Sequence, residues 1–554
     1  MSQSGSRARG RILQVVALLG GTLALSQAYA SPPPPVTDSC SALRVLDLTG
    51  LMDGPSAMPA KVLSATLTTG QKLTPEQTAQ LAKRSRAMGA SISESITELP
   101  DHCLVDGYVN PHIKFQMRLP AAQDWNSKFL LSACDGWCGR VSEDPTMVGL
   151  VRKYASLTTD GGHTGEHLFD GVWAADNMPA RIDFGYRANH VLLIAAKAIM
   201  KAYYGNEPKY SYITGCSKGG QAGVMAAARY PHDFDGVLAR GPTINYTKVN
   251  VLRCGGSFKA AVADDGKVRL GAEKAQLIQV AVMEHCDAKD GLRDGLISDP
   301  RKCDFDPASL QCPAGESSAQ CLTEGEVAAL RELYAPVRNS AGKQIYAGVP
   351  YGSEGRWPGG ILPVAGNTKT FVSQCSAEYL KYLAFPKTPS PDYNWRRDFN
   401  WERDQGQLSE MASVYDADTP DLSRFRDAGG KMLVVHGWSD SEIPALASVD
   451  WYDSVSSYMG GRDKVTEFAR LFLLPGVNHC DGGIGPYHYD ALNALEAWVE
   501  RGVAPESIMT TRVVDGHVTR SRPSYPYPIE ARYKGKGSID EAANFAPYDP
   551  RKKK

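Results

Sequence analysis

The residues that point most directly to chemistry are a serine between two glycines, Gly215-x-Ser217-x-Gly219. A short apolar stretch before them predicts a strand, and the alanine-rich segment 221–230 predicts a helix. A serine on such a tight strand-to-helix turn projects its hydroxyl from the edge of a sheet, as in a nucleophile elbow. The glycines leave room for the sharp bend. We therefore predict that Ser217 is a nucleophile for acyl transfer.

An elbow serine needs a base and an orienting acid, and along the chain these follow in the order serine, acid, histidine. Residues 432–435 predict a strand that leads to Asp440, and residues 471–474 predict one that leads to His479. Both side chains therefore follow strand ends, where the partners of an elbow serine are expected. The predicted triad is Ser217, Asp440 and His479, in which His479 moves the proton and Asp440 holds the imidazole tautomer.

Each partner of the serine also has a plainer interpretation. Asp440 could be the N-cap of a helix that starts near Ile443, which is an ordinary role for aspartate. His479 could be a histidine of a surface loop. His436 could compete as the base, but it precedes the acid and would reverse the chain order.

An oxyanion formed by attack on an ester needs two backbone N–H donors. We predict that one is Lys218, directly after the nucleophile, and that the other is Asp135. Asp135 lies in a turn that follows a predicted strand at 128–131.

The length and net charge of the chain limit the classes of protein to which it can belong. The chain has 554 residues and a net charge of −1, which favours two or more domains and gives no reason to expect a nucleic-acid or anionic membrane partner. Residues 1–30 predict a secretion signal, with arginines, an apolar stretch and an Ala-Tyr-Ala cleavage site. A membrane anchor is the alternative, but the apolar stretch is short for one. The mature protein is therefore predicted to be secreted or periplasmic.

The order of predicted elements indicates the fold class. Strands and helices alternate up to about residue 242, resume at 431, and favour a mostly parallel sheet with helices on both faces. Between them the chain is irregular and rich in glycine, proline, tryptophan and cysteine. We predict an α/β-hydrolase fold, with a catalytic domain at 31–242 and 428–554 and an inserted lid domain at 243–427.

Twelve cysteines in an exported chain predict a disulfide framework, although the sequence alone does not fix the pairs. Two of them flank the predicted site, since Cys216 precedes the nucleophile and Cys480 follows the base. A disulfide between these two would tie the elbow to the histidine loop. The chain-entropy estimate for closing a loop of roughly 260 residues is about 5 kcal/mol, as an upper bound.

The Gly-Cys-Ser motif at 215–217 and the His-Cys motif at 479–480 resemble those of the tannase and feruloyl esterase family. Segments 159–163, 183–188, 436–440 and 478–483 also resemble family signatures, so the resemblance covers nearly the whole mature chain. It implies esters of aromatic acids as substrates, and in one branch a terephthalate monoester. The disulfides that it implies are Cys216–Cys480, Cys40–Cys103, Cys286–Cys303 and Cys312–Cys321, which leaves Cys134–Cys138 and Cys254–Cys375 by elimination.

A loop of the predicted lid places Asp287, Asp290 and Asp294 within eight residues. Oxygen ligands at this density suit calcium, although the spacing is not that of an EF-hand. The family resemblance implies a structural calcium site that also uses the carbonyls of Leu292 and Leu296. The alternative is a solvated acidic turn.

The sequence therefore predicts a secreted serine esterase for small aromatic esters of the tannase or feruloyl esterase type. A hydrolase of mono(2-hydroxyethyl) terephthalate-type monoesters is the first alternative, followed by an acyltransferase or peptidase and by a non-catalytic binding protein. Residues 393–397 and Trp401 are candidate lid contacts for the substrate. The oligomeric state is left open.

Overall fold

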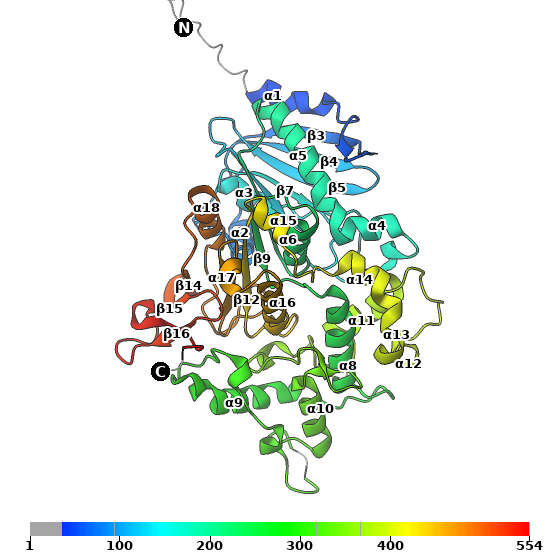
Figure 1. The fold of residues 1–554 in the computed structure, drawn as a ribbon, viewed down its shortest axis with the longest axis vertical. Coiled ribbons are helices and arrows are strands. Elements are labelled where there is room, and N and C mark those ends of the chain that lie inside the picture. Colours follow the sequence, from blue (N-terminus) through cyan, green and yellow to red (C-terminus); the bar gives the residue numbers. More distant parts are fainter. Residues whose placement is uncertain (1–35, 94, 317, 366, 553–554) are drawn as a thin grey trace, which may run out of the picture. The chain divides into compact units, whose positions relative to one another are not determined.

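A nine-stranded sheet with the order β13-β12-β9-β8-β6-β7-β5-β4-β3 runs through this computed structural model (Figure 1). The six strands from β13 to β7 are parallel, and the remaining pairs are antiparallel. The bounds are β3 (Ala60–Thr68), β4 (His102–Val109), β5 (Ile113–Pro120), β6 (Lys128–Ser132), β7 (Ala155–Thr159), β8 (Tyr210–Cys216), β9 (Gly236–Arg240), β12 (Lys431–Gly437) and β13 (Ala469–Leu474).

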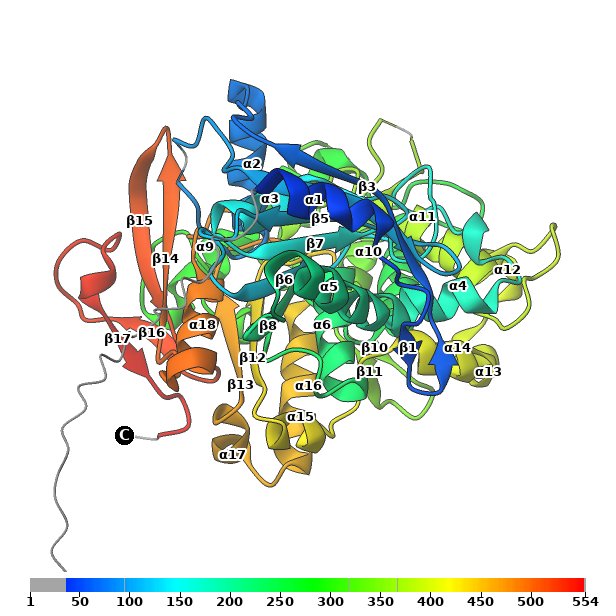
Figure 2. The ribbon, with the colours of Figure 1, turned by 90° about the horizontal axis from the view of Figure 1, so that it is seen from above.

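Helices cover both faces of the sheet (Figure 2). In β12, Met432 and Val434 belong to a hydrophobic cluster with side chains of α5, α6 and α16, whereas Leu433 and Val435 belong to a second cluster with side chains of α2, α3 and α18. Successive strand residues point to opposite faces, so a strand buried on both faces is apolar throughout. The bounds are α2 (Pro75–Ala87), α3 (Asp144–Val151), α5 (Ala188–Tyr204), α6 (Lys218–Arg229), α16 (Ala445–Tyr458) and α18 (Ala491–Arg501).

The structure describes residues 36–93, 95–316, 318–365 and 367–552. The predicted secretion signal at 1–30 lies outside these residues. Within the described part of the chain, no helix is both long enough and apolar enough to cross a membrane.

A long insertion separates β9 from β12 and consists mainly of short helices. Its buried side chains form their own hydrophobic cluster around Trp357, which also takes in Trp137 and Phe184 from the sheet portion. The described residues from Val36 onward form one compact unit, so the lid boundaries at 243 and 427 stay predictions. The helices are α7 (Tyr246–Lys248), α8 (Gly256–Ala261), α9 (Ala275–Cys286), α10 (Glu324–Tyr334), α11 (Phe371–Glu378), α12 (Trp395–Asp398), α13 (Trp401–Asp404), α14 (Ser409–Tyr415) and α15 (Ser423–Asp427).

Two antiparallel hairpins follow the last helix of the sheet portion (Figure 1). β14 (Ile508–Val514) pairs with β15 (His517–Ser524), and β16 (Glu530–Tyr533) pairs with β17 (Phe545–Tyr548).

Five of the six predicted disulfides are present. The sixth pair, Cys254 with Cys375, is wrong for this structure, because both are buried free thiols. The Cys375 thiol donates instead to Asn250 Oδ1 at 3.0 Å. The pairing of Cys254 with Cys375 by elimination assumed that every cysteine forms a disulfide. Both residues are buried in the insertion, where a thiol can stay reduced. The bonded pairs are Cys40–Cys103, Cys134–Cys138, Cys216–Cys480, Cys286–Cys303 and Cys312–Cys321.

Candidate active site

Ser217 stands at the turn between β8 and α6, as the elbow pattern predicts. Its backbone is in the left-handed region, with φ of 56°, which is a strained conformation for a residue with a side chain. The two flanking glycines are required by close backbone approach. A Cβ on Gly215 would lie 2.4 Å from the carbonyl carbon of Gly219, and a Cβ on Gly219 would lie 2.9 Å from Ala133 O.

The predicted acid and base contact each other. His479 Nδ1 lies 2.6 Å from Asp440 Oδ2, although the two residues are 39 positions apart. The other oxygen of Asp440 accepts the backbone N–H groups of Glu442 and Ile443 at 2.9 and 2.8 Å. Asp440 therefore fixes the local turn and also orients the imidazole, so the two sequence interpretations of this residue are compatible.

His436 contacts the same carboxylate from the other side. Its Nε2 lies 3.1 Å from Asp440 Oδ2, and its Nδ1 lies 2.9 Å from Ser448 Oγ. The ring is 1 % exposed and does not line the cavity at Ser217. His436 is thus placed to support Asp440 rather than to accept a proton from the serine.

The charges around His479 favour its protonated form. Burial by itself lowers the pKa of His479, but the carboxylates of Asp440 and Glu442 raise it to about 9. Glu442 Oε2 lies 4.0 Å from Nε2, the nitrogen that faces the cavity. Burial raises the pKa of Asp440, but the two histidines outweigh burial and hold it well below its usual range. Asp440 therefore stays ionised.

Ser217 and His479 border one cavity without a hydrogen bond between them among the described residues. Ser217 Oγ lies 3.3 Å from Thr243 Oγ1, and His479 Nε2 lies 3.7 Å from Cys216 Sγ. Catalytic hydrogen bonds are often long without substrate and tighten in the complex. The disulfide between Cys216 and Cys480 joins the residues next to the serine and the histidine, which are 264 positions apart.

The cavity has a volume of about 200 Å³, and two portions of the chain form its walls. The sheet portion contributes Ser217, His479 and the turn after β6, with Asp440 buried behind them, while the insertion contributes apolar, polar and thiol side chains. Its lining residues are Asp135, Gly136, Trp137, Leu168, Phe169, Cys216, Ser217, Lys218, Thr243, Tyr246, Val249, Asn250, Cys254, Phe371, Cys375, Glu442, Ile443 and His479.

Both predicted oxyanion donors line this cavity. Lys218 is the first residue of α6, so its N–H has no acceptor within the helix. The Asp135 N–H donates to no acceptor among the described residues. The Cys134–Cys138 disulfide holds the Asp135 turn, and the Asp135 carboxylate is turned to Arg84 at 3.0 Å.

The sequence-based candidates for lid contacts do not line the cavity. Arg396 donates to Val262 O and Ala263 O, and Arg397 pairs with Asp398. Trp401 packs against the hydrophobic cluster of the insertion. The lining residues that sequence reasoning missed include Phe169, Tyr246 and Asn250, which lie in segments without a motif.

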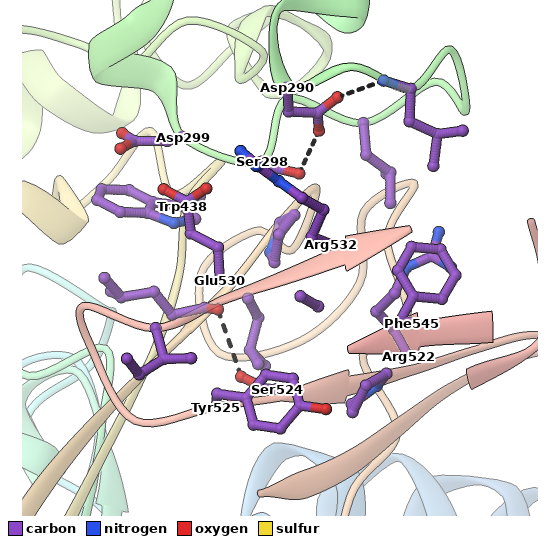
Figure 3. Close-up of a pocket in the computed structure, with 18 of the residues that line it drawn as sticks. Asp290, Ser298, Asp299, Trp438, Arg522, Ser524, Tyr525, Glu530, Arg532 and Phe545 are labelled. Atoms are coloured by element: carbon purple, nitrogen blue, oxygen red, sulfur yellow. Dashed lines mark hydrogen bonds between the residues drawn. The ribbon is translucent and has the colours of Figure 1, made fainter. Parts of the chain in front are cut away.

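A cavity larger than the one at Ser217 lies elsewhere and shares no lining residue with it. It has a volume of about 480 Å³ and is formed by the acidic loop of the insertion, the end of β13 and the C-terminal hairpins (Figure 3). Trp438, Tyr525 and Arg532 are among its lining side chains. It contains none of the predicted triad, so size alone would have pointed away from the predicted chemistry.

The predicted calcium loop forms one side of that larger cavity. Its oxygens are already in use: Asp287 accepts the N–H groups of Asp294 and Gly295, and Asp294 pairs with Arg522 at 2.6 Å. Burial raises the pKa of Asp294 to about 6, although Arg522 opposes the shift.

Whether this loop can hold calcium depends on how closely its oxygens approach one another. Among the described residues, Asp287, Asp290 and Asp294 form no set in which one oxygen of each lies within 4.8 Å of the others. The donor chemistry fits calcium, but the oxygens do not converge on one ion in this arrangement.

Comparison with known proteins identifies the class. The family model for tannase and feruloyl esterase matches residues 98–547. The chain therefore belongs to the tannase and feruloyl esterase family, and it is a carboxylic ester hydrolase with the α/β-hydrolase-like fold that the sequence predicted.

Individual relatives refine the comparison. The chain is 32 % identical over 529 residues to mono(2-hydroxyethyl) terephthalate hydrolase of Piscinibacter sakaiensis, covering 82 % of this chain and 86 % of the relative. It is 29 % identical over 445 residues to probable feruloyl esterase B-1 of Aspergillus terreus, covering 76 % and 81 %. The solved feruloyl esterase B of Aspergillus oryzae superposes with a TM-score of 0.78 at 24 % identity, covering 93 % of this chain and all of that one.

Proposed function

We propose that this protein is a secreted serine esterase that hydrolyses small esters of aromatic acids through an acyl-enzyme on Ser217. The observation that carries the proposal is the contact of His479 Nδ1 with the buried Asp440 carboxylate, at the edge of the cavity that Ser217 lines. That contact fixes the tautomer in which Nε2 is free to accept the serine proton.

In the proposed reaction Ser217 Oγ attacks the ester carbonyl while its proton passes to His479 Nε2. The tetrahedral oxyanion accepts the N–H groups of Lys218 and Asp135. The intermediate then collapses, and the alcohol leaves with the proton from His479. Water attacks the acyl-enzyme in the same way, gives a proton to His479, and releases the acid with Ser217 restored.

The character of the cavity supports an aromatic acyl group. Trp137, Phe169, Tyr246 and Phe371 bring four aromatic side chains to its lining, and Leu168 and Val249 add aliphatic surface. Flat apolar walls with few polar groups favour a planar ring. The named activities of the relatives, on feruloyl and terephthalate esters, agree with this chemistry.

Export is supported by two observations. Residues 1–30 have the pattern of a secretion signal, and five disulfides occur among the described residues. We propose a secreted or periplasmic location on this basis.

The loop at Asp287, Asp290 and Asp294 is proposed as a structural calcium site, to which the carbonyls of Leu292 and Leu296 would contribute. Calcium would neutralise the three carboxylates of this short loop, which follows Cys286 of the Cys286–Cys303 disulfide. Adding calcium to chelator-treated protein should raise the melting temperature, and Asp287→Ala should abolish the rise. An unchanged melting temperature in the unsubstituted protein would refute the site.

Hydrolysis of a substrate panel tests the proposed function. The panel holds methyl gallate, methyl ferulate and mono(2-hydroxyethyl) terephthalate, and Ser217→Ala is the control. We expect turnover of at least one ester by the unsubstituted protein and none above background by the variant. Equal turnover by the two proteins would remove Ser217 from the mechanism, and the preferred ester would distinguish the two substrate classes.

A further inference from the structure

The cavity at Ser217 contains a cation for which the proposed mechanism has no use. Lys218 provides a backbone donor, but its side chain is buried with only 3 % of the residue exposed. Its Nζ lies over the ring of Phe184, 4.6 Å from the centroid. Among the described residues Nζ has no carboxylate partner and no hydrogen-bond acceptor. A buried ammonium without a partner is destabilising, so its presence calls for an explanation.

A second polar group at this cavity also lacks a partner within the described part of the chain. Tyr246 is 2 % exposed, and its buried hydroxyl makes no hydrogen bond to any described residue. The rings of Tyr246 and Phe184 meet edge to face with centroids 5.9 Å apart, so Tyr246 borders the same aromatic group that Nζ covers. Lys218 and Tyr246 both line the cavity. One ammonium and one hydroxyl therefore belong to residues that line the same cavity, and no described residue uses their hydrogen-bonding capacity.

The other polar groups of this cavity are already engaged. Asp135 pairs with Arg84 at 3.0 Å, and Glu442 lies 4.0 Å from His479 and 3.6 Å from Arg356. Their pairing leaves Lys218 without a counter-ion in the part of the chain that the structure describes.

Among the described residues, the remaining polar groups around this cavity supply no negative charge. The neutral amide of Asn250 donates to Tyr246 O at 2.7 Å and accepts from Cys375. Behind the cavity, burial lowers the pKa of His163 to about 4, and the charge of Lys218 acts in the same direction. Burial raises the pKa of the Cys375 thiol, which therefore stays neutral.

We propose that the Lys218 ammonium, with the Tyr246 hydroxyl, binds an acidic oxygen carried by the aromatic ring of the acyl group. The inference rests on the proposed function, because it assigns the far end of the acyl group whose carbonyl Ser217 attacks. A carboxylate and a phenolic group on the ring share one feature, an oxygen that can accept hydrogen bonds from both the ammonium and the hydroxyl. The acidic oxygen of the ligand then serves as the counter-ion that the Lys218 ammonium lacks among the described residues.

The protonation state of Lys218 makes the inference testable by pH. Burial lowers the pKa of Lys218 to about 7. The ammonium is therefore present below about pH 7 in the free enzyme and is lost as the pH rises. A substrate that needs the ammonium should lose its advantage over a neutral analogue in the same range, whereas the titration of His479 affects both substrates alike and cancels in their ratio.

The test measures kcat/KM for three esters with the same ring: methyl benzoate, methyl 4-hydroxybenzoate and monomethyl terephthalate. The quantity compared is the preference for each acidic ester over methyl benzoate. We expect Lys218→Met to lower at least one preference by about 10- to 100-fold, as for loss of a charge-assisted hydrogen bond, and Tyr246→Phe to lower it by about fivefold. Lys267→Met, at a lysine whose side chain is 84 % exposed, is the matched control and should leave the preferences unchanged.

The two acidic esters distinguish the sources of the oxygen. A loss confined to monomethyl terephthalate assigns a carboxylate, and a loss confined to methyl 4-hydroxybenzoate assigns a phenol. In the unsubstituted enzyme the affected preference should fall as the pH rises through about 7, a readout that does not depend on whether a variant folds. Unsubstituted enzyme that hydrolyses these esters with no preference, or a preference that survives in Lys218→Met, overturns the inference. Absence of hydrolysis of any aromatic ester overturns the proposed function as well.

Discussion

Two groups of polar side chains at the cavity beside Ser217 differ in how completely they are satisfied. Behind Ser217, Asp440 accepts four hydrogen bonds, two from histidines and two from backbone N–H groups, and a disulfide joins Cys216 to Cys480. Among the described residues, by contrast, the Lys218 ammonium and the Tyr246 hydroxyl have no hydrogen-bond partner, and Cys254 and Cys375 form no disulfide.

The difference separates two tasks. In the proposed mechanism the groups that move a proton must be held in one geometry before substrate arrives, and the contacts of Asp440 with His479 and His436 hold the acid and the base in place. Groups that select a substrate must leave hydrogen-bonding capacity for it, so they stand unsatisfied in the free enzyme. The predictions below begin with the acid and base beside Ser217 and end with the thiols of the insertion, in order of decreasing effect.

Breaking the contact between Asp440 and His479 should have the largest effect. Asp440→Asn keeps the size of the side chain but removes the charge that holds the imidazole tautomer, and we expect kcat to fall by about 10⁴-fold. Steady-state kinetics with the preferred ester measures this. Asp453→Asn, a change at an aspartate of α16 outside the cavity, should leave kcat unchanged. A loss of less than about tenfold in Asp440→Asn would show that the acid lies elsewhere.

Removing the disulfide next to the triad should affect activity before it affects the fold. We expect Cys216→Ser with Cys480→Ser to lower kcat/KM by about 10- to 100-fold, because the serine and histidine loops lose their shared tether. The melting temperature should fall as well, since the chain-entropy estimate is about 5 kcal/mol as an upper bound. The control is Cys312→Ser with Cys321→Ser, which removes a bridge of the insertion. Full activity in the first double variant would contradict a role for this disulfide in aligning the triad.

Glu442 should set the pH range of activity. It helps to raise the pKa of His479 to about 9, and the base works only when neutral, so kcat/KM should rise with pH toward that value. Glu442→Gln removes a negative charge, lowers the pKa of His479, and should move the rising limb to lower pH by about 1 unit. Glu410→Gln, at an exposed glutamate, should not move it. A shift to higher pH, or none, would contradict the assigned electrostatics.

The two free cysteines of the insertion, Cys254 and Cys375, lead to a prediction that counting thiols can test. Unfolding the protein without reductant should expose two thiols per chain to a thiol reagent, since Cys254 and Cys375 are unbonded. In the folded state their burial should slow the reaction strongly. A count of zero would mean that the two are joined and that the original sixth pairing was right.

The sequence was sufficient for the parts of the site that follow backbone motifs. Ser217 was located by the glycines that its turn requires, and Asp440 and His479 were located by the strands before them. These positions are fixed by local geometry, which leaves a local signal. The cysteines beside them added a resemblance that led to the correct family.

Other features depend on packing between distant segments and leave no such signal. Tyr246 and Phe169 reach the cavity through the packing of the insertion, whereas Arg396, a sequence candidate for substrate contact, turns back to Val262 O. The free state of Cys375 depends on a partner, Asn250, that is 125 positions away. The unpaired charge of Lys218 could be recognised only once the carboxylates of its cavity, Asp135 and Glu442, were seen to contact other residues.

Labelling with a fluorophosphonate tests the central claim most directly, because the reagent reacts only with a serine that an adjacent base activates. Intact mass and peptide mapping should show one adduct per chain, on Ser217, with loss of esterase activity in proportion to labelling and no adduct in Asp440→Asn over the same time. An adduct on another residue, or full esterase activity in completely labelled protein, would contradict the account.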